Sequence, residues 1–178
     1  MKCNIDGASK GNPSIAGYAG LIRDEKDFIK SIFPSHLGKA TNNMAELMAF
    51  EKCLEILRDS NLKNTIIEAD FKFIINSVKK FCNGLAPDKV LRHWRLLPIY
   101  HRIQSHLQNM RTLSFFHVRR TTNRLADILA NEGVIYSKSY IKYEWIRTPH
   151  GRLREECDRQ VHLDRELYQS RGNQMDEE

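Results

Sequence analysis

Four acidic residues of this chain stand among apolar neighbours, either at the end of an extended stretch or within a helical pattern: Asp6, Glu46, Asp70 and Asp127. An isolated carboxylate in such surroundings costs several kcal/mol or takes up a proton. The cost falls when several carboxylates share divalent cations, because hard cations bind oxygen ligands and neutralise the repulsion between acids. The four acids are therefore candidate metal ligands, although each one alone is also explained as a helix-cap or strand-edge residue.

The apolar periodicity predicts the elements that would carry these acids. Strands are expected at residues 2–6, 16–23, 28–34, 65–70 and 112–118. Helices are expected at residues 44–58, 71–81, 88–109 with a break at Pro98, and 123–132 closed by Gly133. This order predicts an α/β fold with a five-stranded mixed sheet flanked by helices, and it argues against a doubly wound dinucleotide-binding fold.

Length and composition predict a single domain with a tail. The chain has 178 residues, of which 41% are hydrophobic, and this is enough for one substantial core. We expect the domain to span residues 1–135. Residues 136–178 read as a charged extension, with a marginal helix between residues 152 and 168 or partial disorder. Such an extension could dock on the domain or on a partner.

Charge and cysteine content narrow the function classes. The formal net charge is +6, and residues 1–135 carry all of the basic excess, which fits a polyanionic partner but also an ordinary solvated surface. The four cysteines are scattered without a C-x-x-C pair, so we expect free thiols in a reducing compartment. The absence of a long apolar run or a signal-peptide pattern predicts an intracellular protein, nuclear or cytoplasmic, that is not secreted and has no membrane segment.

Four ordered motifs then carry a resemblance to a known family. They are DGASKGNP at residues 6–13, TNNMAEL at 41–47, IEAD at 67–70 and HVRRTTNRLADILANEG at 117–133. Together they resemble type 1 ribonuclease H, most of all the plant-type domains found alone or at the end of retroelement reverse transcriptases. The first motif alone would be a weak signal, because glycine-rich loops commonly follow strands. The resemblance covers about residues 2–135.

The resemblance implies an endoribonuclease that hydrolyses the RNA strand of an RNA/DNA hybrid. It implies two Mg²⁺ ions, with Mn²⁺ as an alternative, one lowering the pKa of the attacking water and one stabilising the leaving oxygen. Asp6 would bridge both ions, and Asp127 would lie nearest the ion that binds the water. Asp70, on the strand next to that of Asp6, and Glu46, near the start of the first long helix, would complete the set. We expect the chain to act as a monomer.

The resemblance also implies residues that bind the hybrid, which must be distinguished from duplex DNA and duplex RNA by its 2′-hydroxyls. Asn42 and Asn43 would contact the RNA strand, whereas Asn12 and Thr41, aided by Lys39, would bind a phosphate of the DNA strand. Thr41 is also expected to cap the following helix. Three further residues would bind the backbone or order an acid: Arg119, Arg120 and Asn123.

Two departures from the family pattern keep other readings open. Phe71 stands where the family generally has Ser, and the loop before the last helix holds arginines where many relatives have a histidine. His117 lies on a strand and is interpreted as a packing or edge residue. A noncatalytic domain that binds RNA/DNA hybrids, derived from a retroelement, is therefore the alternative. An integrase or exonuclease is a weaker one, because the Thr-Asn-Asn motif argues against it.

Overall fold

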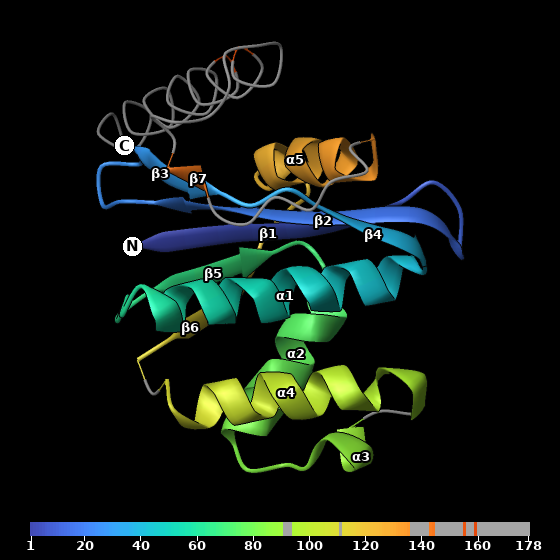
Figure 1. Ribbon diagram of the computed structural model, residues 1–178. Coiled ribbons are helices and arrows are strands. Elements are labelled where there is room, and N and C mark those ends of the chain that lie inside the picture. The colour runs from blue at the N-terminus through green and yellow to red at the C-terminus, as the bar shows by residue number, and fades with distance from the viewer. Residues whose placement is uncertain (91–93, 111, 136–142, 145–154, 156–158, 160–178) are drawn as a thin grey trace, which may run out of the picture.

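The structure is a computed structural model that describes residues 1–90, 94–110, 112–135, 143–144, 155 and 159 (Figure 1). None of the helices in these parts of the chain is long and apolar enough to cross a membrane. Apart from Glu155 and Arg159, which are helical, the predicted helix between residues 152 and 168 lies outside the described residues. The rest of the predicted extension 136–178 also lies outside them, except for a short strand at residues 143–144 that joins the main sheet.

One mixed sheet organises the molecule, in the order β6-β5-β1-β2-β3-β7, with β4 paired to β2. The central strand β1 is antiparallel to β2 but parallel to β5, so the sheet changes its pairing mode at β1. This arrangement confirms the predicted α/β fold with a mixed sheet. The strands are β1 (Lys2–Ser9), β2 (Ser14–Arg23), β3 (Ile29–Ile32), β4 (Ser35–Ala40), β5 (Ile66–Ala69), β6 (Ser114–His117) and β7 (Tyr143–Glu144).

The predicted count of five strands was too low, because β4 and β7 were not expected. The predicted third strand ends early as β3, and the chain then continues along the same edge of β2 as β4. Only the first residue of β4 is buried, so the strand lacks the apolar alternation by which strands are recognised. Gly38, at a φ of 75°, interrupts it further.

Helices cover both faces of the sheet, with α5 on one face and α1, α2 and α4 on the other (Figure 1). Thr41 caps α1 as predicted, because its hydroxyl accepts a hydrogen bond from the backbone N–H of Met44 at 3.2 Å. The apolar residues Leu47, Phe50, Leu54 and Leu57, which recur at helical spacing, are buried in the core. The helices are α1 (Asn42–Asp59), α2 (Lys72–Cys82), α3 (Pro87–Val90), α4 (Leu97–Gln108) and α5 (Arg124–Ile135), with a 3₁₀ turn η1 (Trp94–Leu96) before α4.

The predicted break near Pro98 is present, because α4 begins at Leu97 and Pro98 lies in its first turn, where a proline is tolerated because its missing N–H needs no partner. The predicted end of the last helix was wrong. Gly133 was expected to end the last helix, but it lies inside α5. A Cβ at Gly133 would lie 2.5 Å from the backbone oxygen of Ser35, so this glycine allows α5 to pack closely on β4.

The core has one cluster on each side of the sheet, and β1 alternates between them. Cys3 and Ile5 pack with α1, whereas Ala8 packs with α5. The period of two in a strand therefore directs Asn4 and Asp6 toward the α5 side. Cys3 and Cys53 are buried free thiols with their Sγ atoms 2.8 Å apart, and the described Cys82 is also free, as predicted.

Candidate active site

Gly7 allows the first helix to reach the strand that carries Asp6. A Cβ at Gly7 would lie 2.2 Å from the backbone N of Glu46, a distance that no side chain can occupy. The glycine that follows Asp6 therefore lets the first turns of α1 lie directly against β1. This contact brings Glu46, which begins the second turn of α1, beside the acid on the strand.

Three of the four predicted acids converge. One carboxylate oxygen each from Asp6, Glu46 and Asp70 lies within 4.8 Å of the other two. Asp6 comes from β1 and Glu46 from α1, while Asp70 follows directly after β5, the parallel neighbour of β1. Asp6 is 5% exposed and Glu46 4% exposed. The three oxygens are close enough to share a cation.

The electrostatics of this cluster favour either protons or a cation. Burial, together with the negative charges of Asp70 and Asp127, raises the pKa of Asp6 from 3.8 to about 8. Burial also raises the pKa of Glu46 well above its usual value, and Asp6 and Asp70 add to the effect. Glu46 Oε2 is buried without a hydrogen-bond partner among the described residues. An unpaired buried carboxylate oxygen of this kind is a suitable ligand for a hard cation.

Asn123 holds the third acid in place. Its side chain is 1% exposed, and Nδ2 donates to the backbone oxygen of Ile5 at 2.8 Å and to Asp70 Oδ1 at 3.4 Å. Asn123 precedes α5, so it connects this helix to both β1 and the end of β5. Of the two roles considered for Asn123, its burial favours ordering an acid over contacting substrate.

Asp127 is close to the cluster but paired elsewhere. Its charge contributes to the raised pKa of Asp6, yet the compact group of three described acids does not include it. Arg120 Nη2 donates to Asp127 Oδ1 at 3.1 Å, and Asn131 Nδ2 donates to the same oxygen at 3.4 Å. Asp127 therefore lies at the margin of the site, with its carboxylate directed toward the loop that precedes α5.

The family model that matches residues 4–133 is described as Reverse transcriptase-like. This match covers most of the chain. The chain belongs to the Reverse transcriptase-like family. Its mixed sheet with flanking helices is what the predicted resemblance to type 1 ribonuclease H required, and that resemblance is confirmed.

Named relatives of this Reverse transcriptase-like chain include ribonucleases H. A ribonuclease HI of Halobacterium salinarum is 31% identical over 130 residues, which are 73% of this chain and 62% of that protein. An Arabidopsis thaliana protein named for ribonuclease H is 28% identical over 146 residues, or 82% of this chain and 22% of that protein. The chain thus spans less than two thirds of either relative.

Solved structures agree with this Reverse transcriptase-like fold. The crystal structure of RNase H1 from Halobacterium salinarum is 28% identical, with a TM-score of 0.64 over 75% of this chain and 96% of that one. LC11-RNase H1, solved in complex with an RNA/DNA hybrid, is 25% identical, with a TM-score of 0.65 over 75% and 96%. The fold is therefore that of ribonuclease H.

The residues predicted to bind the hybrid lie in the loop after β1, on β4, at the start of α1 and in the loop before α5 of the Reverse transcriptase-like domain. Asn12 Oδ1 accepts a hydrogen bond from the backbone N–H of Asn42 at 3.3 Å, which joins the loop after β1 to the start of α1. Asn42 and its neighbour Asn43 are half-buried in the first turn of α1. Lys39 is exposed on β4 and pairs with Ile15 of β2. Arg119 is exposed in the loop before α5.

Three other residues, none of them predicted to belong to the site, lie near the acids. His117 Nε2 lies 3.1 Å from the backbone oxygen of Asp70, so this edge residue contacts the segment that carries an acid. Phe71 precedes α2 and supplies no side-chain cap to that helix. Asn4 is buried beside Asn123. Its signal in the sequence was an amide two residues before Asp6, on the same face of a strand.

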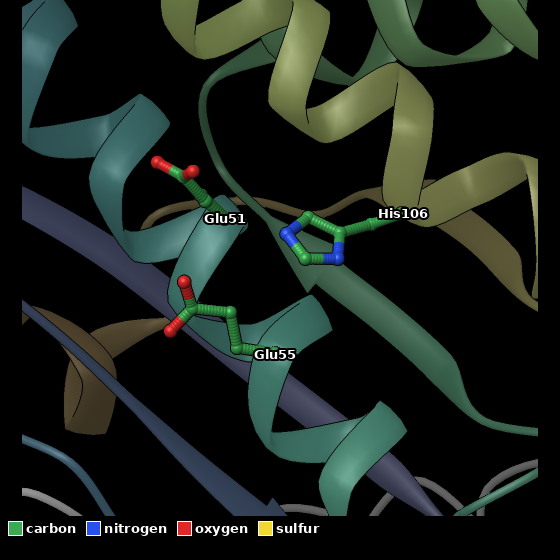
Figure 2. Close-up of side chains that lie close together, drawn as sticks. All are labelled: Glu51, Glu55 and His106. Carbon is green, nitrogen blue, oxygen red and sulfur yellow. The ribbon is translucent and has the colours of Figure 1, made fainter.

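A second group of acids lies between α1 and α4. Glu51 and Glu55 of α1 and His106 of α4 lie close together (Figure 2). Arg102 makes a bidentate ion pair with Glu51, and Lys52 pairs with Glu55 at 2.7 Å. Because both acids already have basic partners, this group is explained as a link between two helices.

Proposed function

We propose that this chain is a metal-dependent endoribonuclease that hydrolyses the RNA strand of RNA/DNA hybrids. The observation that carries the proposal is the convergence of Asp6, Glu46 and Asp70 on a few ångströms of buried space. The likeness to a structure solved with an RNA/DNA hybrid supports the substrate class. Residues 1–135 would form the catalytic domain, acting as a monomer.

The acids fit a divalent cation on chemical grounds. Three carboxylates with two strongly raised pKa values repel each other when ionised, and Glu46 Oε2 lacks a partner among the described residues. Oxygen ligands of this kind match Mg²⁺. Asp6, Glu46 and Asp70 would hold the metal, and Asp127 would join them if its carboxylate turned away from Arg120.

Two bound Mg²⁺ ions, or Mn²⁺ in their place, would lower the pKa of the attacking water and stabilise the leaving oxygen. The chain's own residues keep the site ready for this chemistry. Asn123 fixes the Asp70 carboxylate, and Gly7 holds α1 against β1 so that Glu46 stays beside Asp6. The surrounding core excludes water from the buried sides of these carboxylates.

Hybrid recognition would use the loop after β1 and the start of α1. Asn42 and Asn43 would contact 2′-hydroxyls of the RNA strand, and Asn12 and Thr41 would bind a phosphate of the DNA strand. The Asn12–Asn42 hydrogen bond supports this assignment, because it holds the two segments together before substrate arrives. Three exposed or partly exposed basic residues would add phosphate attraction: Lys39, Arg119 and Arg120.

The test is cleavage of a fluorescent RNA/DNA hybrid, beside duplex DNA and duplex RNA, with Mg²⁺ and with EDTA. We expect only the hybrid to be cut, only with metal, and activity to be abolished in Asp70→Asn and in Asp6→Asn. Lys63→Ala, an exposed lysine beyond α1, serves as a control with unchanged activity. Absence of cleavage with both Mg²⁺ and Mn²⁺ would contradict the proposal.

A noncatalytic module that binds hybrids is the second candidate. The observation that favours it is the ion pair between Arg120 and Asp127, which occupies the fourth acid. Binding of the hybrid without cleavage, with affinity that is unaffected by Asp70→Asn, would support this alternative over the enzyme.

A further inference from the structure

A row of buried and half-buried polar side chains crosses three adjacent strands on the α5 side of the sheet. Asn4 of β1 lies at its centre, with Arg23 of β2 on one side and Glu68 of β5 on the other. Asn4 and Glu68 are direct partners in the parallel pairing of β1 and β5. Asn4 is 1% exposed and Arg23 7% exposed. Polar groups buried this deeply destabilise a protein unless their hydrogen bonds are made.

Chemistry alone fixes the direction of the hydrogen bonds around Asn4. A guanidinium can only donate, so the Asn4 atom that lies 3.2 Å from Arg23 Nη2 must be the oxygen Oδ1. Asn4 Nδ2 then faces the other way and donates to Glu68 Oε2 at 2.9 Å and to Asn123 Oδ1 at 3.3 Å. A reversed amide would set N–H groups against the guanidinium and an oxygen against a carboxylate.

The orientation of Asn4 in turn fixes that of Asn123. Because Asn123 Oδ1 accepts from Asn4, its Nδ2 is the group that meets the backbone oxygen of Ile5 and Asp70 Oδ1. A reversed Asn123 would present its oxygen to two acceptors, which repel it. The row therefore determines which atom of Asn123 faces Asp70.

We propose that Asn4 is a positioning residue for Asp70, acting through Asn123, and that Arg23 and Glu68 set the orientation of Asn4. The proposal rests on the proposed function in one respect, namely that Asp70 is a metal ligand. Groups that orient a ligand from behind contribute about 10–100-fold to metal affinity or activity. Asn4 itself contacts neither metal nor hybrid in this scheme.

The experiment replaces Asn4 by leucine, which has similar size and no polar atoms. Mn²⁺ binding is measured by calorimetry without nucleic acid, and the Mg²⁺ concentration for half-maximal hybrid cleavage is measured separately. In Asn4→Leu we expect Mn²⁺ to bind about tenfold more weakly and the Mg²⁺ requirement to rise about tenfold. The KM for the hybrid should not change, because the residues proposed to bind it lie elsewhere.

Two further variants separate positioning from stability. Ile67→Val removes a methyl group on the α1 side of the strand that carries Glu68. It should lower the melting temperature and leave Mn²⁺ binding unchanged. Asn4→Ser keeps a small polar side chain that is too short to reach Asn123, so it should weaken Mn²⁺ binding as leucine does. It provides the test if Asn4→Leu does not fold.

The outcomes distinguish this proposal from the proposed function. A folded Asn4 variant with wild-type Mn²⁺ affinity and Mg²⁺ requirement would overturn the positioning role. A wild-type chain that binds Mn²⁺ but does not cut the hybrid would contradict the proposed function alone, and weaker Mn²⁺ binding in Asn4→Leu would still support positioning. A wild-type chain that binds no Mn²⁺ would overturn both.

Discussion

The buried carboxyl group of Asp6 makes the stability of the metal-free protein depend on pH. Its pKa in the folded chain is about 8, whereas the unfolded chain has the ordinary value of 3.8. Between these values the folded protein keeps a proton that the unfolded chain has lost. Stability from this group is therefore fully present at low pH and is lost as pH rises toward 8.

Asp6→Asn should remove this dependence, because asparagine does not titrate. In EDTA we expect the free energy of unfolding of the variant to exceed that of the wild type increasingly from pH 5 to pH 8, by at most about 1.4 kcal/mol per pH unit. Urea unfolding at each pH measures the difference. Parallel pH profiles for the two proteins would contradict the raised pKa. Saturating Mg²⁺ should reverse the order, because only the wild type keeps the full ligand set.

Arg120 is expected to have two opposing effects on catalysis. Its pair with Asp127 is largely exposed, so Arg120→Ala should change the free energy of unfolding by less than about 1 kcal/mol. Loss of the Arg120 guanidinium should raise the KM for the hybrid. The Asp127 carboxylate, released from this pair, should lower the Mg²⁺ concentration needed for activity. Steady-state kinetics across a Mg²⁺ series separate the two effects. Arg119→Ala, in the same loop, should raise KM only, and equal Mg²⁺ requirements in both variants would refute the idea.

The sequence identified the acids and named Asn123 as a residue that could order one of them, but it did not identify Asn4. Asp6, Glu46 and Asp70 were recognisable because carboxylates in apolar surroundings need an explanation and because their motifs are ordered. Asn4 was not recognisable in this way, because its partners lie 19, 64 and 119 residues away along the chain. Hydrogen-bond partners this distant follow only from the strand register. The ion pair between Arg120 and Asp127 likewise depends on the conformation of the loop before α5, which the sequence does not reveal.

The first helix depends on Gly7 for its position against β1. Gly7→Ala would place a Cβ 2.2 Å from the backbone N of Glu46, so α1 must shift away from the strand. We expect a loss of about 1–3 kcal/mol or more in stability together with weaker Mn²⁺ binding. Thermal unfolding and calorimetry measure the two effects.

Gly38→Asn is the matched control for this prediction. It adds a side chain where no atom lies within 4 Å of the new Cβ, at a positive φ that asparagine tolerates. Mn²⁺ binding should therefore stay at the wild-type level. If Gly7→Ala also kept wild-type binding, the close approach of α1 would be irrelevant to the site.

Most elements followed from periodicity, and the exceptions share a cause. The helices α1 and α2 and the strands β1, β2, β5 and β6 have apolar patterns of sufficient length. The strand β4 was missed because it is held in the sheet by its pairing with β2, and its side chains are not buried alternately. Gly133 was taken for a helix end because glycine commonly ends helices. Its role here is to leave room for the backbone of Ser35, which lies on another element and is not visible in the local sequence.

The acidic cluster draws on several layers of the molecule. Asp6 and Asp70 come from the sheet, Glu46 from the helical layer on one face, and Asn123 from the start of the helix on the other. The site is therefore complete only when both layers are docked. The fold and the convergence of Asp6, Glu46 and Asp70 therefore depend on each other.

The change from antiparallel to parallel pairing at β1 also has a kinetic consequence. The hairpin of β1 and β2 joins residues close in the chain, whereas β1 and β5 join residues 64 apart, which requires a large loop to close.

If the parallel pairing of β1 and β5 forms after the main folding barrier, the acids meet only on the native side of that barrier. We then expect Mg²⁺ to slow unfolding while leaving the refolding rate nearly unchanged. Stopped-flow kinetics in Mg²⁺ and in EDTA test this, and faster refolding with Mg²⁺ would place the pairing before the barrier. The cation would thus prolong the lifetime of the folded state without hastening its formation.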